Sequence, residues 1–325
     1  MLIPRFWSRA EAEAVTPDGT PVRFQVWRGS RASHAEASAL AHDAIGRMAD
    51  RISRGAGFPE KYAYGDRPLR EEVIQEIPGT GADPDAAITR NSYGALVLNA
   101  ARAFFIDVDV EGSDRPPAAP REPHAAPEPA QSLWGIVDSL PLPGSLRSIV
   151  DQFRPASGSP APPRPAAPAA SADPAAEAVE RLRRWVATRP GWRVRVYRTY
   201  AGLRYLVTHA PFSPTDAETQ QVLAAVGADP QYIRLCQVQK SFRARLTPKP
   251  WRIGMENPPE SFSFADAGAE RRTREWEARY DRAGAGHATC RFVEEIGTGA
   301  EHPDIAPIRA LHDERTRATS GLPLA

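Results

Sequence analysis

The order of apolar and polar side chains predicts a strand and a long helix near the start of the chain. Residues 20–28 alternate between apolar and polar side chains, which is the pattern of a strand with one buried face. Ser33 and Glu36 form the capping-box pattern that begins a helix, and small and apolar residues continue it to a stop near Gly55. We therefore expect a helix of about five turns here.

A second helix and a hairpin are predicted in the next segment. A polar connector with aromatic and arginine side chains covers residues 62–72 and leads into an expected short helix. Two apolar runs follow over residues 87–110 with almost no separation, so we expect a hairpin whose second strand spans Ala103–Val110. That strand carries Asp107 and Asp109 among its apolar residues.

Composition changes abruptly after Gly112. Fifteen of the chain's 33 prolines lie between residues 113 and 174. Such a segment buries too little apolar surface to offset the entropy of ordering it, so a disordered insertion, partly in the polyproline II conformation, is expected over residues 113–173. Its apolar patch from Leu133 to Val150 has no role, forms a transient helix on the parent domain, or binds a protein partner.

The arginine-rich remainder, residues 174–325, is predicted to complete the domain begun by residues 1–112. The expected elements in its first half are a helix, two strands in a hairpin, two helices and a strand, at residues 174–185, 192–197, 203–209, 214–226, from 230 onward, and 241–247. With the Ala103–Val110 strand in front, the order is βαββαβ, which predicts an α+β fold of the ferredoxin-like or RRM-like kind. A helix at 269–282, a strand at 288–296 and a helix at 305–317 follow.

Several classes of protein are disfavoured by the composition. The two cysteines lie in no CxxC pattern, so neither a zinc site nor a disulfide framework is indicated. The N-terminus has no continuous apolar stretch of the signal-peptide kind, and no run approaches the roughly 18 apolar residues of a membrane span. A soluble cytoplasmic protein with no membrane partner is expected. Phosphate-binding loops of the Walker or Rossmann kind are not found in the sequence, and a triad hydrolase gains no support.

Asp107 and Asp109 are the first candidate site residues. They are two positions apart on a predicted strand, so their carboxylates leave the same face while Ile106, Val108 and Val110 point into the core. Their mutual repulsion must be relieved, and Mg²⁺ or Mn²⁺ does so where a phosphate substrate completes the ligand shell. The alternative is that the two acids simply pair with Arg193 or Arg243 across the sheet.

A strongly basic segment is the second candidate. Residues 181–252 hold fourteen Lys and Arg against three Asp and Glu, a local charge of +11 in a chain whose net charge is +1. Arginines that alternate with apolar residues on a strand suit a polyphosphate or a nucleic-acid backbone, and Tyr197, Tyr200 and Trp251 are available to stack on bases. A solvated arginine-rich surface is the alternative. His209 ends a predicted strand and either reaches the acidic site or is structural.

The order of these motifs resembles the catalytic core of the archaeo-eukaryotic primase-polymerase superfamily. Phe105-Ile-Asp107-Val-Asp109 is similar to its first motif, and the segment from Asp229 through Phe242-Arg243-Ala-Arg245 to Lys249 is similar to its third. The second motif departs, because Thr199-Tyr-Ala-Gly202-Leu-Arg204 has arginine at the position of the family's histidine. As a whole, the chain also resembles a group of uncharacterised bacterial proteins, which supplies no function; the shared segments begin at Arg67, Arg90 and Phe242.

The primase-polymerase resemblance implies a metal-dependent nucleotidyl or phosphoryl transfer protein that acts on a nucleotide or single-stranded nucleic acid. In this hypothesis Asp107 and Asp109 bind Mg²⁺ or Mn²⁺ and Asp229 is a third catalytic carboxylate. The residues expected to bind substrate are Arg198, Thr199, Arg204, His209, Arg243, Arg245, Lys249 and Arg252. The alternative function is a non-catalytic protein that binds nucleic acid or protein partners.

Overall fold

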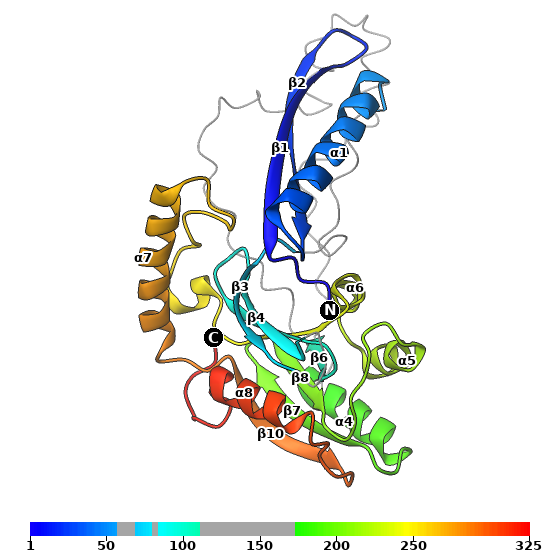
Figure 1. The fold of residues 1–325 in the computed structure, drawn as a ribbon. Coiled ribbons are helices and arrows are strands. Elements are labelled where there is room, and N and C mark those ends of the chain that lie inside the picture. Colours follow the sequence, from blue (N-terminus) through cyan, green and yellow to red (C-terminus); the bar gives the residue numbers. More distant parts are fainter. Residues whose placement is uncertain (57–68, 80–83, 111–172) are drawn as a thin grey trace, which may run out of the picture. The chain divides into compact units, whose positions relative to one another are not determined.

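The computed structural model describes residues 1–56, 69–79, 84–110 and 173–325. Strands β1 (Phe6–Val15) and β2 (Pro21–Ser30) pair antiparallel along their whole length (Figure 1). Helix α1 (His34–Ser53) packs on this hairpin through a small apolar cluster that includes Val26 and Ile45. Ser33 accepts a hydrogen bond from the Glu36 backbone N–H at 3.1 Å, so the expected cap is formed.

A four-stranded antiparallel sheet combines strands from both ends of the sequence. Its order is β3 (Glu72–Ile77), β4 (Ala86–Arg90), β5 (Leu96–Ala100) and β9 (Phe242–Arg245). A tight turn at residues 91–94 joins β4 to β5, and Gly94 has the positive φ of 89° that favours glycine there. Strand β9 therefore continues a hairpin that lies about 145 residues earlier in the chain.

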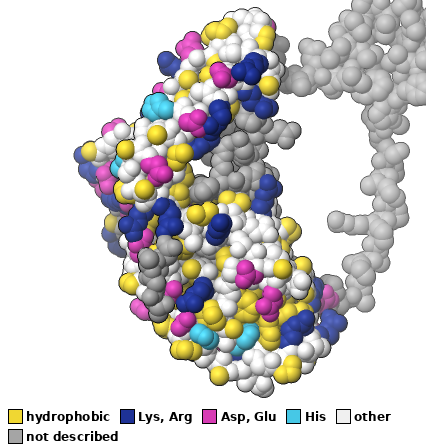
Figure 2. Space-filling model, turned by 45° about the vertical axis from the view of Figure 1, so that its right-hand side comes forward, with side chains coloured by type: hydrophobic (Ala, Val, Ile, Leu, Met, Phe, Trp, Pro, Cys, Tyr) yellow, Lys and Arg dark blue, Asp and Glu magenta, His cyan; other side chains and the backbone are white. Residues whose placement is uncertain are grey.

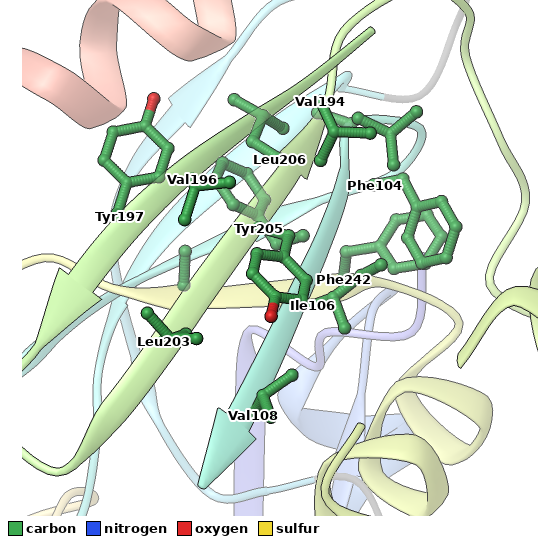
Figure 3. Close-up of a cluster of buried hydrophobic side chains, with 14 of the residues drawn as sticks. Phe104, Ile106, Val108, Val194, Val196, Tyr197, Leu203, Tyr205, Leu206 and Phe242 are labelled. Carbon is green, nitrogen blue, oxygen red and sulfur yellow. The ribbon is translucent and has the colours of Figure 1, made fainter. Parts of the chain in front are cut away.

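A second four-stranded antiparallel sheet contains the strand with the two aspartates. Its order is β10 (Cys290–Gly297), β7 (Arg193–Thr199), β8 (Gly202–Val207) and β6 (Phe104–Asp109). Figure 3 shows Phe104, Ile106 and Val108 along β6 within the buried cluster. Ile106 and Val108 are at most 3% exposed, so their predicted inward direction is confirmed, and Val110 is partly buried against the same cluster.

Helices cover the sheets and complete the core. Their bounds are α4 (Pro174–Ala187), α5 (Ala217–Val226), α6 (Pro230–Gln239), the short 3₁₀ helix η1 (Pro250–Ile253), α7 (Ala267–Gly284) and α8 (Ala306–Thr316). Helix α8 packs on the β6–β8–β7 sheet through His312, whose ring contacts Phe105 and Tyr197 at centroid distances of 5.0 and 4.9 Å. Residues before and after the 111–172 gap belong to one compact unit.

The mixed α+β class and the order of elements after residue 173 agree with the sequence analysis. The expected strand pair around Gly202 forms as β7 and β8, and β6 lies beside β8. A single ferredoxin-like sheet would also pair β9 with β6, whereas β9 pairs with β5 in the other sheet. β6 and β9 are nevertheless close neighbours in space, so the acidic strand and the arginine strand meet at a junction between two sheets.

Two local predictions were wrong. The expected short helix after residue 70 is strand β3, because Val73 and Ile77 belong to a β-branched segment that pairs with β4. The expected hairpin over residues 87–110 is also different. Its first apolar run forms both strands of the β4–β5 hairpin, and Ala103–Val110 belongs to the other sheet. Strand β1 was not located in the sequence analysis.

The described helices include none that is both long enough and apolar enough to cross a membrane. The predicted disordered insertion, with its apolar patch from Leu133 to Val150, lies outside the described residues. The polar connector before β3 lies mostly outside them as well.

Candidate functional site

A pocket with a volume of about 330 Å³ lies where the two four-stranded sheets meet. Three aspartates and five basic side chains line it, together with backbone and aromatic groups. The charged lining residues are Asp107, Asp109, Asp229, Arg204, Arg243, Arg245, Lys249 and Arg252. All of them come from the segments that the sequence analysis selected, and Thr199 also lines the pocket.

The three aspartates reach the pocket from two elements. Asp107 and Asp109 lie opposite Arg204 and Gly202 in the β6–β8 ladder, so they leave the same face of the sheet. Asp229 precedes α6, and its carboxylate caps that helix by accepting from the Gln231 N–H at 2.8 Å. The backbone N–H of Asp229 donates to the carbonyl oxygen of Asp107 at 3.1 Å, which fixes the start of α6 beside β6.

Arg204 binds Asp107 through two parallel hydrogen bonds. Its Nε donates to Oδ1 at 2.7 Å and one Nη donates to Oδ2 at 3.2 Å. The arginine side chain is 2% exposed and the aspartate side chain 33% exposed, so one partner is buried and the other faces the pocket. Burial by itself lowers the pKa of Arg204, but the adjacent carboxylate outweighs it and the pKa is raised. Arg204 is therefore charged at every physiological pH.

Asp109 lies in an environment of excess negative charge. Burial raises its pKa, and the charges of Asp229 and Asp107 raise it further. Lys249 and Arg252 oppose this effect without cancelling it. A bound cation would relieve the repulsion between Asp109 and the neighbouring carboxylates that Lys249 and Arg252 do not cancel.

Basic side chains from β9 and from the segment after it form a second part of the lining, here called the basic wall. Arg245 is the last residue of β9. Lys249 lies directly before η1, and Trp251 and Arg252 lie within it. The Lys249 ammonium lies 5.3 Å from the Trp251 ring centre, and the Arg252 guanidinium lies 4.0 Å from that of Tyr200. Trp251 and Tyr200 thus contact two cations of the pocket without lining it themselves, whereas Tyr93 and Tyr232 are among the lining residues.

Arg243 has a structural setting that the sequence did not indicate. It is 6% exposed and donates to Asn99 and Gln239 at 2.5 and 2.6 Å, and to Glu71 at 2.7 Å. Glu71 is itself buried, so Arg243 lines the pocket as one partner of a buried ion pair. The prediction that Arg243 binds substrate phosphate is not supported by this position.

Two predicted substrate ligands, Arg198 and His209, do not line the pocket. His209 is five residues beyond Arg204, about 16 Å along an extended strand. Its ring lies against Trp192 and Phe212 at 4.4 and 5.7 Å, and burial lowers its pKa. The alternative that His209 has a structural role therefore fits this position. Arg198 lies opposite Leu203 on β7 but is not among the lining residues.

Acids from the C-terminal part of the chain compensate much of the basic segment. Arg183 pairs with Glu294, Arg193 with Glu295, and Arg195 with both Glu295 and Asp313. Figure 2 shows Lys and Arg interspersed with Asp and Glu on the face in view. The local charge of +11 over residues 181–252 therefore left out acidic partners that lie on β10 and α8. The proposed pairing of Asp107 and Asp109 with Arg193 or Arg243 was wrong, because those arginines bind other acids.

Several residues near the pocket were not found in the sequence. Asn91 and Tyr93 come from the β4–β5 turn, and Gln231 and Tyr232 from α6. The Asn91-Ser-Tyr-Gly94 segment is a turn pattern, and polar turns often carry binding residues. Tyr197 was expected to stack on a base, but it is fully buried and donates its hydroxyl hydrogen bond to Asp313 at 2.7 Å.

Cys290, His312 and Asp313 lie in the order of a thiol–imidazole–carboxylate triad. The Cys290 Sγ is 3.9 Å from Nε2 of His312, and Nδ1 of the same ring is 3.0 Å from Asp313. The sequence gave no sign of this grouping, because the residues come from β10 and α8. Cys290 and His312 have no exposed surface, and none of the three lines the pocket, so no substrate reaches the thiol.

The pocket residues fit a cation held by two carboxylates and by oxygens of a bound phosphate. Each oxygen of Asp107 accepts one hydrogen bond from Arg204 and keeps a lone pair, and Asp109 is exposed. Across the described ranges, the model shows no group of three or more His, Cys, Asp or Glu side chains arranged as a metal cage. Mg²⁺ is commonly bound through one or two carboxylates plus substrate phosphates, so such a cage is not required.

The arrangement brings three carboxylates, five cations and two tyrosines to one cavity. It is suited to a ligand that carries phosphate groups, with or without an accompanying divalent cation. Comparison of this chain with protein-family models, with curated proteins and with solved structures finds no match.

Proposed function

We propose that the protein binds a nucleotide together with Mg²⁺ or Mn²⁺ in this pocket and transfers its phosphoryl or nucleotidyl group. The observation that carries the proposal is the juxtaposition of Asp107, Asp109 and Asp229 with Arg245, Lys249 and Arg252 around one cavity. These residues come from segments separated by more than a hundred positions. Surface ion pairing alone gives no reason for three acids and several cations to face a common space.

Asp107 and Asp109 would hold the cation on the acidic wall. The raised pKa of Asp109, caused by burial and by the neighbouring charges of Asp229 and Asp107, supports this role. When bound, a divalent cation supplies charge neutralisation for phosphate oxygens and for the oxygen of the leaving group.

The chain's own cations would bind the remaining phosphate charge. Arg245 and Arg252 present planar guanidinium groups, which form paired hydrogen bonds to phosphate oxygens, and Lys249 adds a point charge. Trp251 and Tyr200 lie against Lys249 and Arg252, so a base that extends from the phosphates past these cations would meet an aromatic ring. Together these groups orient the ligand with its phosphates toward β6.

The resemblance to the primase-polymerase superfamily supports the same proposal. Its first motif matches β6 and its third motif matches Asp229 and β9. The second-motif histidine is replaced by Arg204, whose guanidinium binds Asp107. We propose that Arg204 holds the metal-binding carboxylate rather than a triphosphate, because its side chain is 2% exposed. We also propose that β6, β7, β8 and β9, with the helices between them, derive from a ferredoxin-like βαββαβ core.

Asp109→Asn is the sharpest test, because Asp109 is exposed and is not the partner of a buried cation. Isothermal titration with a non-hydrolysable nucleoside triphosphate and Mn²⁺ should give binding by the parent and a loss of at least about tenfold in the variant. Asp281→Asn, an exposed change on α7 with the same loss of charge, is the matched control. Equal affinity of the parent and Asp109→Asn for the Mn²⁺–nucleotide pair would reject the proposal.

A second function is favoured by the ion pair between Asp107 and Arg204. That pair already neutralises one aspartate without a metal, which suits a protein that binds single-stranded nucleic acid and performs no catalysis. Binding to a single-stranded oligonucleotide that is salt-sensitive, persists in chelator and survives Asp109→Asn would select this function. Binding that requires Mn²⁺ and Asp109 would select the first.

A further inference from the structure

A chain of buried polar groups extends from the pocket to helix α8. One Nη of Arg204 binds Asp107. The other Nη donates to the carbonyl oxygen of Arg245 at 2.9 Å and lies 3.4 Å from Nε2 of His312. The His312 ring has no exposed surface, and its Nδ1 is 3.0 Å from Asp313. Asp313 also accepts from the Tyr197 hydroxyl at 2.7 Å and from Arg195 at 3.0 Å.

The donor and acceptor properties of these groups favour one tautomer of the neutral His312 ring. A guanidinium can only donate hydrogen bonds, so Nε2 of His312 must be the acceptor in its contact with Arg204. The ring proton then lies on Nδ1, where it is donated to Asp313. Asp313 is held in turn by Tyr197 and Arg195, and the Cys290 Sγ lies 3.9 Å from Nε2 of the same ring.

Arg204 also joins the two sheets at the pocket. Its Nε and one Nη hold the side chain of Asp107 on β6, while its other Nη holds the backbone of Arg245 on β9. A change in the position of this guanidinium would therefore displace a residue on the acidic wall and a residue on the basic wall together. A fully buried cation requires all of its donors to be bound, and His312 supplies the acceptor on the side away from the pocket.

We infer that His312 and Asp313 are positioning residues, which hold Arg204 and through it the Asp107 carboxylate and the Arg245 backbone in the geometry of the pocket. This inference rests on the proposed function for its effect on ligand binding. Neither residue lines the pocket, and both act through Arg204. Partners of this kind, one shell behind a ligating carboxylate, commonly change metal affinity by 10- to 100-fold when they are removed.

The test compares His312→Leu, which removes both ring nitrogens, with His312→Gln, whose side-chain carbonyl can still accept from Arg204. Two readouts are measured on the full chain: solvent exchange of the Arg204 Nε–H by NMR, and the affinity for Mn²⁺ with a non-hydrolysable nucleoside triphosphate. We expect His312→Leu to speed the exchange and to weaken nucleotide binding by about tenfold. His312→Gln should stay within about threefold of the parent in both readouts, because it retains the acceptor.

The two readouts separate this inference from the proposed function. A folded His312→Leu variant with parental exchange and parental affinity would overturn the positioning role and leave the proposed function standing. If the parent binds no Mn²⁺–nucleotide, the proposed function fails, and faster exchange of the Arg204 Nε–H in His312→Leu decides the positioning role alone. If circular dichroism shows that His312→Leu is unfolded, Asp313→Asn replaces it, with the same change in exchange expected and unchanged exchange overturning the inference.

Discussion

Arg204 and Asp107 face one another in register on neighbouring strands, with the guanidinium buried and the carboxylate at the edge of the pocket. The paired hydrogen bonds between them occupy one lone pair of each carboxylate oxygen. The arginine thus fixes the direction of the Asp107 carboxylate and leaves its remaining lone pairs for a ligand.

Asp107→Asn should destabilise the protein strongly, because it leaves the buried guanidinium of Arg204 without its counter-charge. We expect the free energy of unfolding to fall by about 3–5 kcal/mol, measured by urea denaturation. The double substitution Asp107→Leu with Arg204→Met should recover much of this loss, since it removes both charges. Arg47→Ala, which breaks an exposed pair with Asp43, should cost less than about 1 kcal/mol. A loss for Asp107→Asn as small as that for Arg47→Ala would contradict the argument.

Asp109→Asn should make the protein without ligand more stable at neutral pH. The pKa of Asp109 is raised by burial and by the nearby charges of Asp229 and Asp107, so the folded state binds a proton more tightly than the unfolded state does. The parent should therefore lose stability relative to the variant as pH rises from about 4 through the raised pKa. Urea midpoints at pH 4, 5 and 7 measure the difference. The two proteins should converge at the lowest pH and separate at pH 7, and parallel curves would refute this sign.

Addition of Mn²⁺ should make the parent more stable than Asp109→Asn. A ligand that binds only the folded state raises the apparent stability, and Asp109 is a proposed ligand of the cation. We expect millimolar Mn²⁺ to raise the melting temperature of the parent, and to have a smaller effect on Asp109→Asn. Asp281→Asn should respond as the parent does, because its carboxylate lies on α7 outside the pocket.

Lys249→Gln should weaken the binding of single-stranded nucleic acid uniformly across sequences, if the basic wall contacts phosphates. Removal of one phosphate contact should reduce the slope of log affinity against log salt concentration by about 1. Fluorescence anisotropy with a labelled oligonucleotide at several salt concentrations gives the slope. Arg271→Gln removes the same charge from the exposed face of α7 and should leave the slope unchanged. An equal effect of the two substitutions would indicate that the pocket makes no specific phosphate contact.

Gly202→Ala should distort the acidic strand. Gly202 lies opposite Asp109, and an added Cβ would overlap the carbonyl oxygen of Val108. A backbone atom cannot move aside cheaply, so we expect a loss of about 1–3 kcal/mol in the free energy of unfolding and weaker Mn²⁺–nucleotide binding. Gly46→Ala on helix α1 meets nothing within 4 Å and should stabilise by up to about 1 kcal/mol. Parental binding by Gly202→Ala would show that the pocket tolerates a shift of β6.

Local patterns in the sequence determined much of the secondary structure and the acidic side of the site. The alternation around Asp107 and Asp109 predicted a strand with both carboxylates on one face, because side chains alternate along any strand. The cap at Ser33 and the Asp-Pro starts of α4 and α6 were similarly readable, since capping depends on residues within one turn.

Long-range pairing was decided only by the tertiary structure. Nothing near β9 in the sequence indicates that it pairs with β5, and nothing near Arg243 indicates Glu71 as its partner, because both contacts depend on elements more than a hundred residues away. The same holds for Arg204, whose binding to Asp107 and His312 follows from the register of β6 with β8 and from the packing of α8. The sequence by itself therefore determined which residues carry charge toward a common face. The fold decided which of the charges that line the pocket are buried in ion pairs, since burial and counter-charge are properties of the packed chain.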